Sequence, residues 1–234
     1  MRFLSTLLTL LLAGFGALAL WGAAVRGGAG AFDLAAEPGP LTGRSLTGLV
    51  GDGEACRAEL AQAGVAFVAA PGRYDGRCGP QDPVRPAATG SLTLAMRPAG
   101  VAPSCPVVAG VALWEWHVLQ PAARRHFGTR VAAIEHLGSY SCRRVNNRPD
   151  GAWSEHASAN ALDVAGFRLA DGRRISVAAD WPGDDAASRF LREARDGACG
   201  LFATVLSPEY NAAHRDHFHL DQAARGAAGW RACR

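Results

Sequence analysis

Apolar residues recur along the chain at helical spacing in three stretches, and these stretches predict the helices. The strongest pattern covers residues 106–127, and Gly128 is expected to end it. Its apolar face consists of Val107, Val111, Trp114, Val118 and Ala122. We expect this face, Trp114 included, to pack in the core. Further helices are predicted at residues 53–63, ending before Gly64, and at residues 184–198, where Phe190, Leu191 and Ala194 point inward.

Short apolar runs with alternating or continuous hydrophobicity predict the strands. These runs lie at residues 65–68, 91–96, 130–136 and 202–206. A hairpin is predicted from Phe167 to Val177 around the turn dipeptide Asp171-Gly172. Residues 71–90, rich in Pro and Gly, are expected to be irregular. Because short strands alternate with a few helices without regular βαβ order, the pattern favours an α+β fold.

The apolar segment from Phe3 to Val25 defines the domain organisation. It reaches the roughly 20 residues that cross a hydrocarbon core, whereas a signal peptide has a shorter apolar region. We therefore expect residues 1–25 to be an N-terminal membrane anchor, with a cleaved signal segment as the alternative. In both cases the rest of the chain is exported. Residues 26–48 predict a flexible tether, and residues 49–234 a single domain.

Charge and cysteine content narrow the functional class. The chain has 234 residues, of which 49% are hydrophobic and 19% charged, as in one globular domain with an appendage. A formal net charge of +3 without a basic run gives no sign of nucleic-acid binding. Six scattered cysteines without a Cys-x-x-Cys pair predict three disulfides in an exported protein. We expect the pairs Cys56–Cys78, Cys105–Cys142 and Cys199–Cys233.

Asp163 lies in an otherwise apolar run, Ala161 to Ala165, that predicts a buried strand. An ionised carboxylate in such a run is costly unless it is paired or binds a metal. His156 precedes it by seven residues, which corresponds to about 10 Å along a helix or about 23 Å along a strand. The chain must therefore turn between them if they share an ion, and the small residues 157–160 permit that turn.

A second histidine motif follows far downstream, in the run His214-Arg215-Asp216-His217-Phe218-His219. On a strand, His217 and His219 point to the same face. His156, Asp163 and one of these two histidines would make a three-ligand zinc site with an open position, as in catalytic zinc sites. The spacing does not decide which histidine is the ligand and which is a neighbouring general base. Asp216 is a rival candidate for the base.

These motifs carry a family resemblance. Ser154-x-His156-x-x-Ala159-x-Ala161-x-Asp163 resembles the motif of the zinc D-Ala-D-Ala peptidases, which usually have Gly at the position of Ala159. His214-x-x-His217-x-His219 resembles the penicillin-insensitive murein endopeptidases. The run from Gly138 to Asp221 is similar to the bacterial extensin-like C-terminal domain family. The resemblance implies an α+β domain whose small antiparallel sheet carries the metal ligands.

The resemblance also implies roles for single residues. His156, Asp163 and His219 would bind zinc, and His217 would be the general base, supported by His214 and with Asp216 as the rival. Arg143 would meet a substrate carboxylate or carbonyl, and Ser154 would hold the loop or orient His156. Glu155 is expected at the surface.

The function that follows is a zinc peptidase acting on peptidoglycan stem peptides or cross-links. It would act in the cell envelope, anchored to the inner membrane and facing the periplasm, or secreted to the periplasm. Two alternatives are a hedgehog-like module that binds zinc without turnover and a metal-free wall-binding protein. Retention of His214, Asp216 and His217 beside the ligands speaks against a pure binder, which needs no base.

Overall fold

The helix predicted for residues 106–127 is confirmed in the computed structural model of the protein, which describes residues 32–72, 76–226 and 229–234. The run begins as α4 (Cys105–Trp114), continues through a π-helical segment, η1 (Glu115–Leu119), and ends as α5 (Gln120–Phe127). Gly128 ends it with a left-handed φ of 68°. Trp114 is fully buried, and its ring meets two phenylalanine rings edge-on, which confirms core packing.

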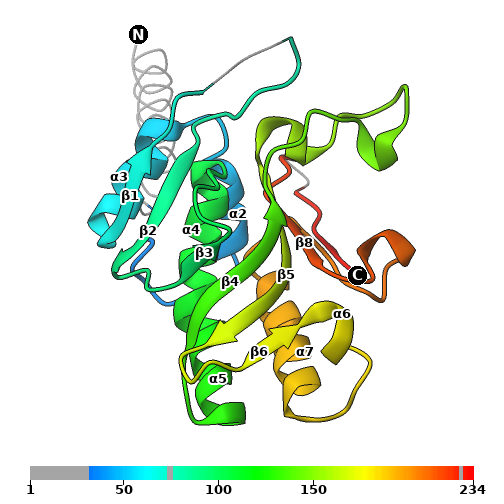
Figure 1. Cartoon of the computed structure of the whole chain (residues 1–234). Helices are drawn as coiled ribbons and strands as arrows, with labels where there is room; N and C mark the ends of the chain where they lie inside the picture. The colour runs from blue at the N-terminus through cyan, green and yellow to red at the C-terminus, as the bar shows by residue number, and fades with distance from the viewer. Residues whose placement is uncertain (1–31, 73–75, 227–228) are drawn as a thin grey trace, which may run out of the picture. The chain divides into compact units, whose positions relative to one another are not determined.

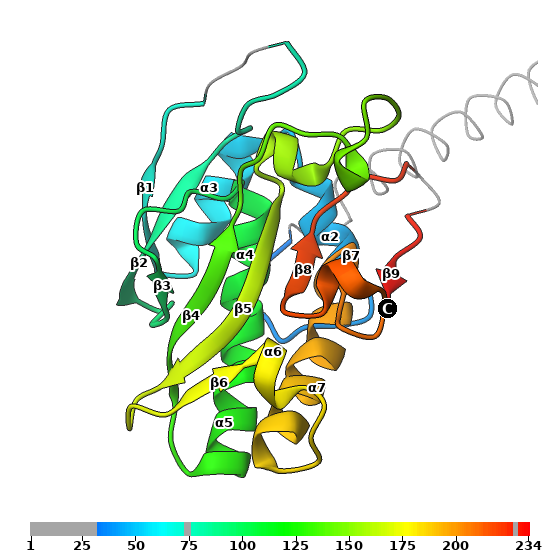
Figure 2. The ribbon, with the colours of Figure 1, turned by 45° about the vertical axis from the view of Figure 1, so that its right-hand side comes forward.

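The main sheet has the strand order β3-β4-β5-β8-β7-β9, and β6 pairs with β5. Its strands are β3 (Ala95–Arg97), β4 (Val131–Gly138), β5 (Ala161–Leu169), β6 (Arg174–Ser176), β7 (Thr204–Leu206), β8 (Phe218–Asp221) and β9 (Ala232–Cys233). The helices α4, α5 and α7 (Ala186–Cys199) cover one face of this sheet (Figure 1 and Figure 2). The α+β class is confirmed. The sheet is larger than the small antiparallel one predicted, and its pairs β3–β4 and β7–β9 are parallel.

A bulge at Ala165 decides which residues of β5 face the helices. Three steps along β5, from Val164 to Phe167, match two steps along β4. Val164 and Phe167 therefore point to the same face, and both side chains are fully buried. Asp163 points to the opposite face, away from the helix layer.

Several local predictions are confirmed. The helix α3 (Gly53–Gln62) is followed by β1 (Val65–Ala69), and Gly64 between them has a positive φ of 73°. The strands β5 and β6 form the predicted hairpin, with Gly172 at a φ of 93° in its turn. The amphipathic helix is α7, whose three predicted inward residues are fully buried. A short helix, α6 (Val177–Asp180), follows the hairpin.

The prediction that residues 71–90 are irregular was wrong for their last seven residues. Residues 84–90 form β2 (Val84–Gly90), which pairs antiparallel with β1 in a separate two-stranded sheet. Pro86 fits in β2 because β2 pairs with β1 alone and is therefore an edge strand. Proline has no backbone N–H, and on an edge strand this need not remove a hydrogen bond between strands. The strand expected at residues 91–96 is reduced to β3. Pairing with distant strands, and not local composition, sets these boundaries.

The predicted tether is partly wrong, because the compact unit begins at Leu34 and not at residue 49. Leu34 and Leu46 are fully buried, and Leu46 lies on the helix α2 (Thr42–Gly48). The Gly- and Pro-rich composition of this stretch concealed two apolar residues that fill the core. The anchor predicted at residues 3–25 lies outside the described residues. Within the described ranges, none of the helices is both long and apolar enough to span a membrane.

All six cysteines are paired, as expected for an exported protein, but two of the three expected pairs were wrong. The disulfides are Cys56–Cys105, Cys78–Cys142 and Cys199–Cys233. The first fastens α3 to the start of α4, and the second fastens residue 78 to the loop that precedes His156. Sequence proximity favoured the wrong partners, because packing of α3 on α4 brings Cys56 to Cys105.

Candidate metal centre

Three side chains from two strands and a turn converge on one point, and together they could hold a metal ion. His156 Nε2 lies 3.1 Å from His219 Nδ1 and 3.1 Å from Asp163 Oδ2. His219 Nδ1 lies 3.0 Å from Asp163 Oδ1. Donor atoms in a tetrahedral zinc site, with bonds of about 2.0–2.1 Å, lie roughly 3.3–3.4 Å apart. Two imidazole nitrogens and a carboxylate at this spacing fit zinc after a small expansion.

The local fold explains how residues seven apart in the sequence meet. Ser154 caps a 3₁₀ turn, η3 (Glu155–Ser158), by accepting a hydrogen bond from the amide of His156. Ala159 then reverses the chain with a positive φ of 56°. Ala159 therefore adopts a conformation that glycine takes without strain. The chain returns along β5 to Asp163.

The third ligand comes from strand pairing. The strands β5 and β8 are antiparallel, and Asp163 lies directly opposite His219 in their register. On β8 the alternating residues Phe218 and Leu220 are fully buried. His219 therefore points to the face of the sheet that also carries Asp163. This register selects His219 over His217 for the triad.

Neighbouring groups fix which ring nitrogen of each histidine is free to bind a metal. His156 Nδ1 donates to the backbone oxygen of Ser139 at 2.8 Å, which leaves Nε2 as the lone-pair donor. His219 Nε2 donates to Asp221 Oδ2 at 3.0 Å, which leaves Nδ1. In both cases the free nitrogen is the one that faces the triad. Such outer partners are typical of histidines that bind metals.

The charges around the triad favour a cation. Burial by itself would raise the pKa of Asp163, but the adjacent imidazoles of His156 and His219 hold that pKa well below its usual range. Burial would lower the pKa of His219, but Asp163 and Asp221 outweigh it and raise that pKa to about 9. The two carboxylates thus stabilise positive charge at His219 Nδ1, where a metal ion would replace the proton.

His217 lies beside the triad and is not part of it. Its Nε2 is 3.7 Å from Asp163 Oδ1, and its Nδ1 is 2.9 Å from Asp216 Oδ1. With the proton on Nδ1, the Nε2 lone pair faces the candidate metal position. Asp216 is itself half-exposed and reaches the site only through His217.

His214 is close to both downstream histidines, with its ring centroid 5.2 Å from that of His217. Its Nδ1 lies 2.8 Å from Asn211 Oδ1, an oxygen that also accepts the amide of Ala213. The proton is therefore on Nδ1, and Nε2 is an acceptor. Burial, followed by the nearby His217 and His219, lowers the pKa of His214 to about 4, so it is neutral at pH 7.

The triad opens into a cleft of about 850 Å³. Arg143 and Ser154 both line it, together with Trp153 and the half-exposed Tyr210. The guanidinium of Arg143 makes no hydrogen bond or ion pair with any residue that the structure describes, so it is free to meet a ligand. Arg143 leads into the loop of η2 (Val145–Asn147), and Tyr210 precedes η4 (Ala212–His214).

Sequence reasoning missed three residues near the triad. Asp221 follows His219 by two positions on β8, and this period of two was a usable signal for a shared face. Ser139 acts through its backbone oxygen, which no sequence pattern reveals. Glu155 is not a surface residue as expected: it lines the cleft, its Oε2 accepts from Asn160 Nδ2 at 2.7 Å, and burial raises its pKa.

Asp221→Asn is expected to weaken zinc binding by about 10- to 100-fold, the usual effect of losing a partner that orients a metal-bound histidine. The amide cannot match the charge of the carboxylate that holds His219 Nε2–H. Zinc affinity, measured by competition with a chromogenic chelator, checks this. Asp184→Asn is the matched control, because Asp184 is exposed and lies away from the cleft. Equal affinities in both variants would contradict an orienting role.

Comparisons with known proteins give one match. The family model described as extensin-like protein C-terminus matches residues 54–234. No curated protein and no solved structure matches the chain.

Proposed function

The chain belongs to the extensin-like protein C-terminus family, and we propose that it is a zinc-dependent peptidase that cleaves peptidoglycan stem peptides or cross-links in the cell envelope. The observation that carries this proposal is the triad of His156, Asp163 and His219 with both imidazole tautomers fixed for metal binding. A structural zinc site normally has four protein ligands, whereas three ligands facing a cleft suit catalysis.

The residues beside the triad match the needs of amide hydrolysis. Zinc bound there would supply Lewis acidity, which activates water and polarises a carbonyl at neutral pH. His217 Nε2 accepts the proton of the attacking water and returns it to the leaving amine as the C–N bond breaks. Asp216 orients His217 and stabilises its protonated form. His214 Nε2, a neutral acceptor, receives a hydrogen bond from a substrate N–H.

Support for a peptidoglycan substrate comes from the cleft and from the motifs. The unpartnered guanidinium of Arg143 suits a carboxylate, which the stem peptides of peptidoglycan carry. The histidine motifs resemble those of murein peptidases, and three disulfides suit an exported protein. We propose a location on the outer side of the inner membrane, or free in the periplasm.

Digestion of purified peptidoglycan tests the proposal. The full chain, loaded with one equivalent of zinc, should release soluble peptide fragments that chromatography and mass spectrometry identify. Chelator treatment should stop the release, and added zinc should restore it. One bound zinc without release of fragments would replace the peptidase with a binding module. Absence of bound metal would contradict the site itself.

A further inference from the structure

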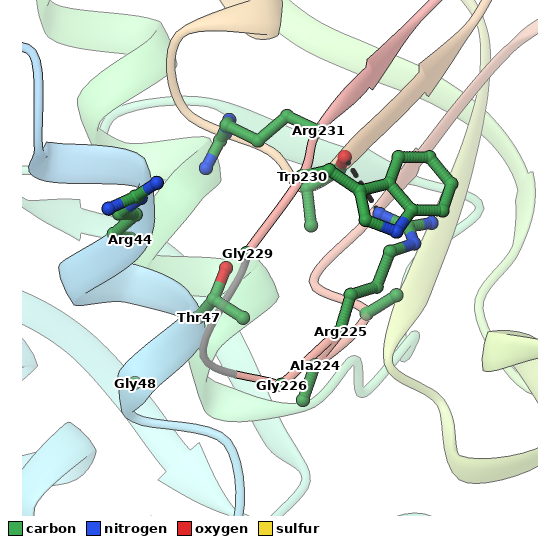
Figure 3. A pocket seen from close by; sticks show the side chains of 11 residues that line it. Arg44, Thr47, Gly48, Ala224, Arg225, Gly226, Gly229, Trp230 and Arg231 are labelled. Carbon is green, nitrogen blue, oxygen red and sulfur yellow. Dashed lines mark hydrogen bonds between the residues drawn. The ribbon is translucent and has the colours of Figure 1, made fainter.

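A second pocket lies behind one wall of the cleft, and arginines dominate it. It has a volume of about 350 Å³ and lies between α2 and the C-terminal segment (Figure 3). Arg44 comes from α2, whereas Arg225 and Arg231 come from the C-terminal segment. Among the described residues that line the pocket there is no Asp or Glu. Three positive charges therefore share this space without a lining carboxylate to neutralise them.

Two of the three guanidinium groups, those of Arg225 and Arg231, are held in place by backbone and hydroxyl oxygens, which do not neutralise their charge. Arg225 donates to the backbone oxygen of Ala203 at 3.0 Å and to the hydroxyl of Thr204. Arg231 donates to the backbone oxygen of Phe202 and lies so close to Gly43 that a Cβ there would collide with it. The positions of these two arginines are thus set before any ligand binds.

Arg231 and Arg44 both keep N–H groups without a partner among the described residues. Arg231 Nε is buried and has no hydrogen-bond partner within the described residues, which is a costly state for a charged group. Arg44 is exposed, and its guanidinium has no hydrogen bond or ion pair with a described residue. Figure 3 shows Arg231 extending from the C-terminal segment toward α2, which carries Arg44. Two carboxylates of the adjoining cleft lie near these arginines: Asp221 attracts Arg231 but is bonded to His219, and Glu155 attracts Arg225 but is bonded to Asn160.

An aromatic ring completes the pocket. Trp230 is 61% exposed, and the Arg225 guanidinium lies 4.3 Å from the ring centroid. An exposed indole beside fixed arginines suits a sugar ring that carries an acidic group.

We infer that this pocket is a binding site for an oxyanion, a carboxylate or phosphate group attached to a sugar. The arginines would bind the anion, and Trp230 would contact the ring that carries it. Ala223, Ala224 and Arg225 line both this pocket and the cleft. A polymer whose anionic group occupies the pocket would therefore pass next to the triad. That such a polymer is the substrate rests on the proposed peptidase function. The anion site itself does not depend on that function.

Calorimetric titration of the full chain with inorganic phosphate and, separately, with glucuronate tests the inference. Both anions should bind saturably, and more weakly as the salt concentration rises. Arg44→Gln should weaken binding about 3- to 5-fold, as for an exposed charge pair, and Arg231→Gln at least about 10-fold. Because Arg44 is exposed and unpartnered, its variant remains informative if Arg231→Gln fails to fold.

Two control arginines separate this pocket from other sites. Arg130→Gln removes an exposed charge elsewhere and should not change anion affinity. Arg143→Gln alters the cleft and should leave intact the anion binding that Arg44→Gln weakens. Binding of phosphate alone or of glucuronate alone would support the site and identify the acidic group. No saturable binding of either anion would overturn the inference. If Arg143→Gln weakens anion binding and Arg44→Gln does not, the inference is also overturned, because the anion would then bind in the cleft.

Discussion

His156→Ala is expected to abolish both zinc binding and the release of peptide fragments from peptidoglycan. His156 supplies one of the three ligand atoms and is only 3% exposed, so its loss removes a buried ligand from the triad. Changes to outer partners of metal ligands already cost about 10- to 100-fold in affinity, and loss of a ligand should exceed the upper end of that range. Zinc content of the purified variant and its digestion of peptidoglycan are the two measurements.

His117→Ala is the control for this result, because His117 lies on η1 and outside the cleft. It should keep both zinc and activity. Thermal unfolding of each variant would separate loss of metal from loss of fold. Asp163→Asn should weaken zinc binding in the same direction, because the amide removes the negative charge at the triad. Stoichiometric zinc in both triad variants would refute the assignment of the ligands.

His217→Ala is expected to keep zinc while its turnover falls by about 10²- to 10⁴-fold, the usual worth of general acid–base assistance. The structure separates the two histidines of the downstream motif by their partners. His219 Nδ1 meets Asp163 at 3.0 Å, whereas His217 Nε2 is 3.7 Å from it and faces the same opening. His219→Ala should therefore lose metal and activity together.

Zinc content and fragment release, measured side by side for the two variants, decide between them. Asp216→Asn should keep zinc and lose less activity than His217→Ala, because Asp216 acts only through the His217 ring. If His217→Ala loses zinc while His219→Ala retains it, the two roles are exchanged. Full activity in His217→Ala would contradict the assignment of His217 as the general base.

Two helices and one hairpin turn could be predicted from the local sequence alone, because interactions between residues close in the sequence determine them. The helical spacing before Gly128 and the amphipathic pattern of α7 specify buried faces that need no knowledge of the partner. The dipeptide Asp171-Gly172 supplies the positive φ that its hairpin turn requires. The strand β2 lacked such a signal, because its pairing with β1 and not its composition makes it a strand.

The triad shows the same division between local and distant information. Sequence spacing established that the chain must turn after His156, and the motifs named the ligands that the structure brings together. Only the β5–β8 register places His219 opposite Asp163 and leaves His217 beside the triad. The partners Asp221 and Ser139, which fix the tautomers, became visible only when side-chain directions were known.

By itself, the sequence therefore determined the fold class, most helices and the candidate ligands. It also determined that all six cysteines form disulfides, but not which cysteines pair. The tertiary structure decided which cysteines pair, how far the domain extends toward the N-terminus and which nitrogen of each histidine faces the site. It also brought Arg44 to Arg225 and Arg231 from opposite ends of the domain. These features depend on contacts between distant residues, which the packing of α2, α3 and β8 creates and local periodicity does not encode.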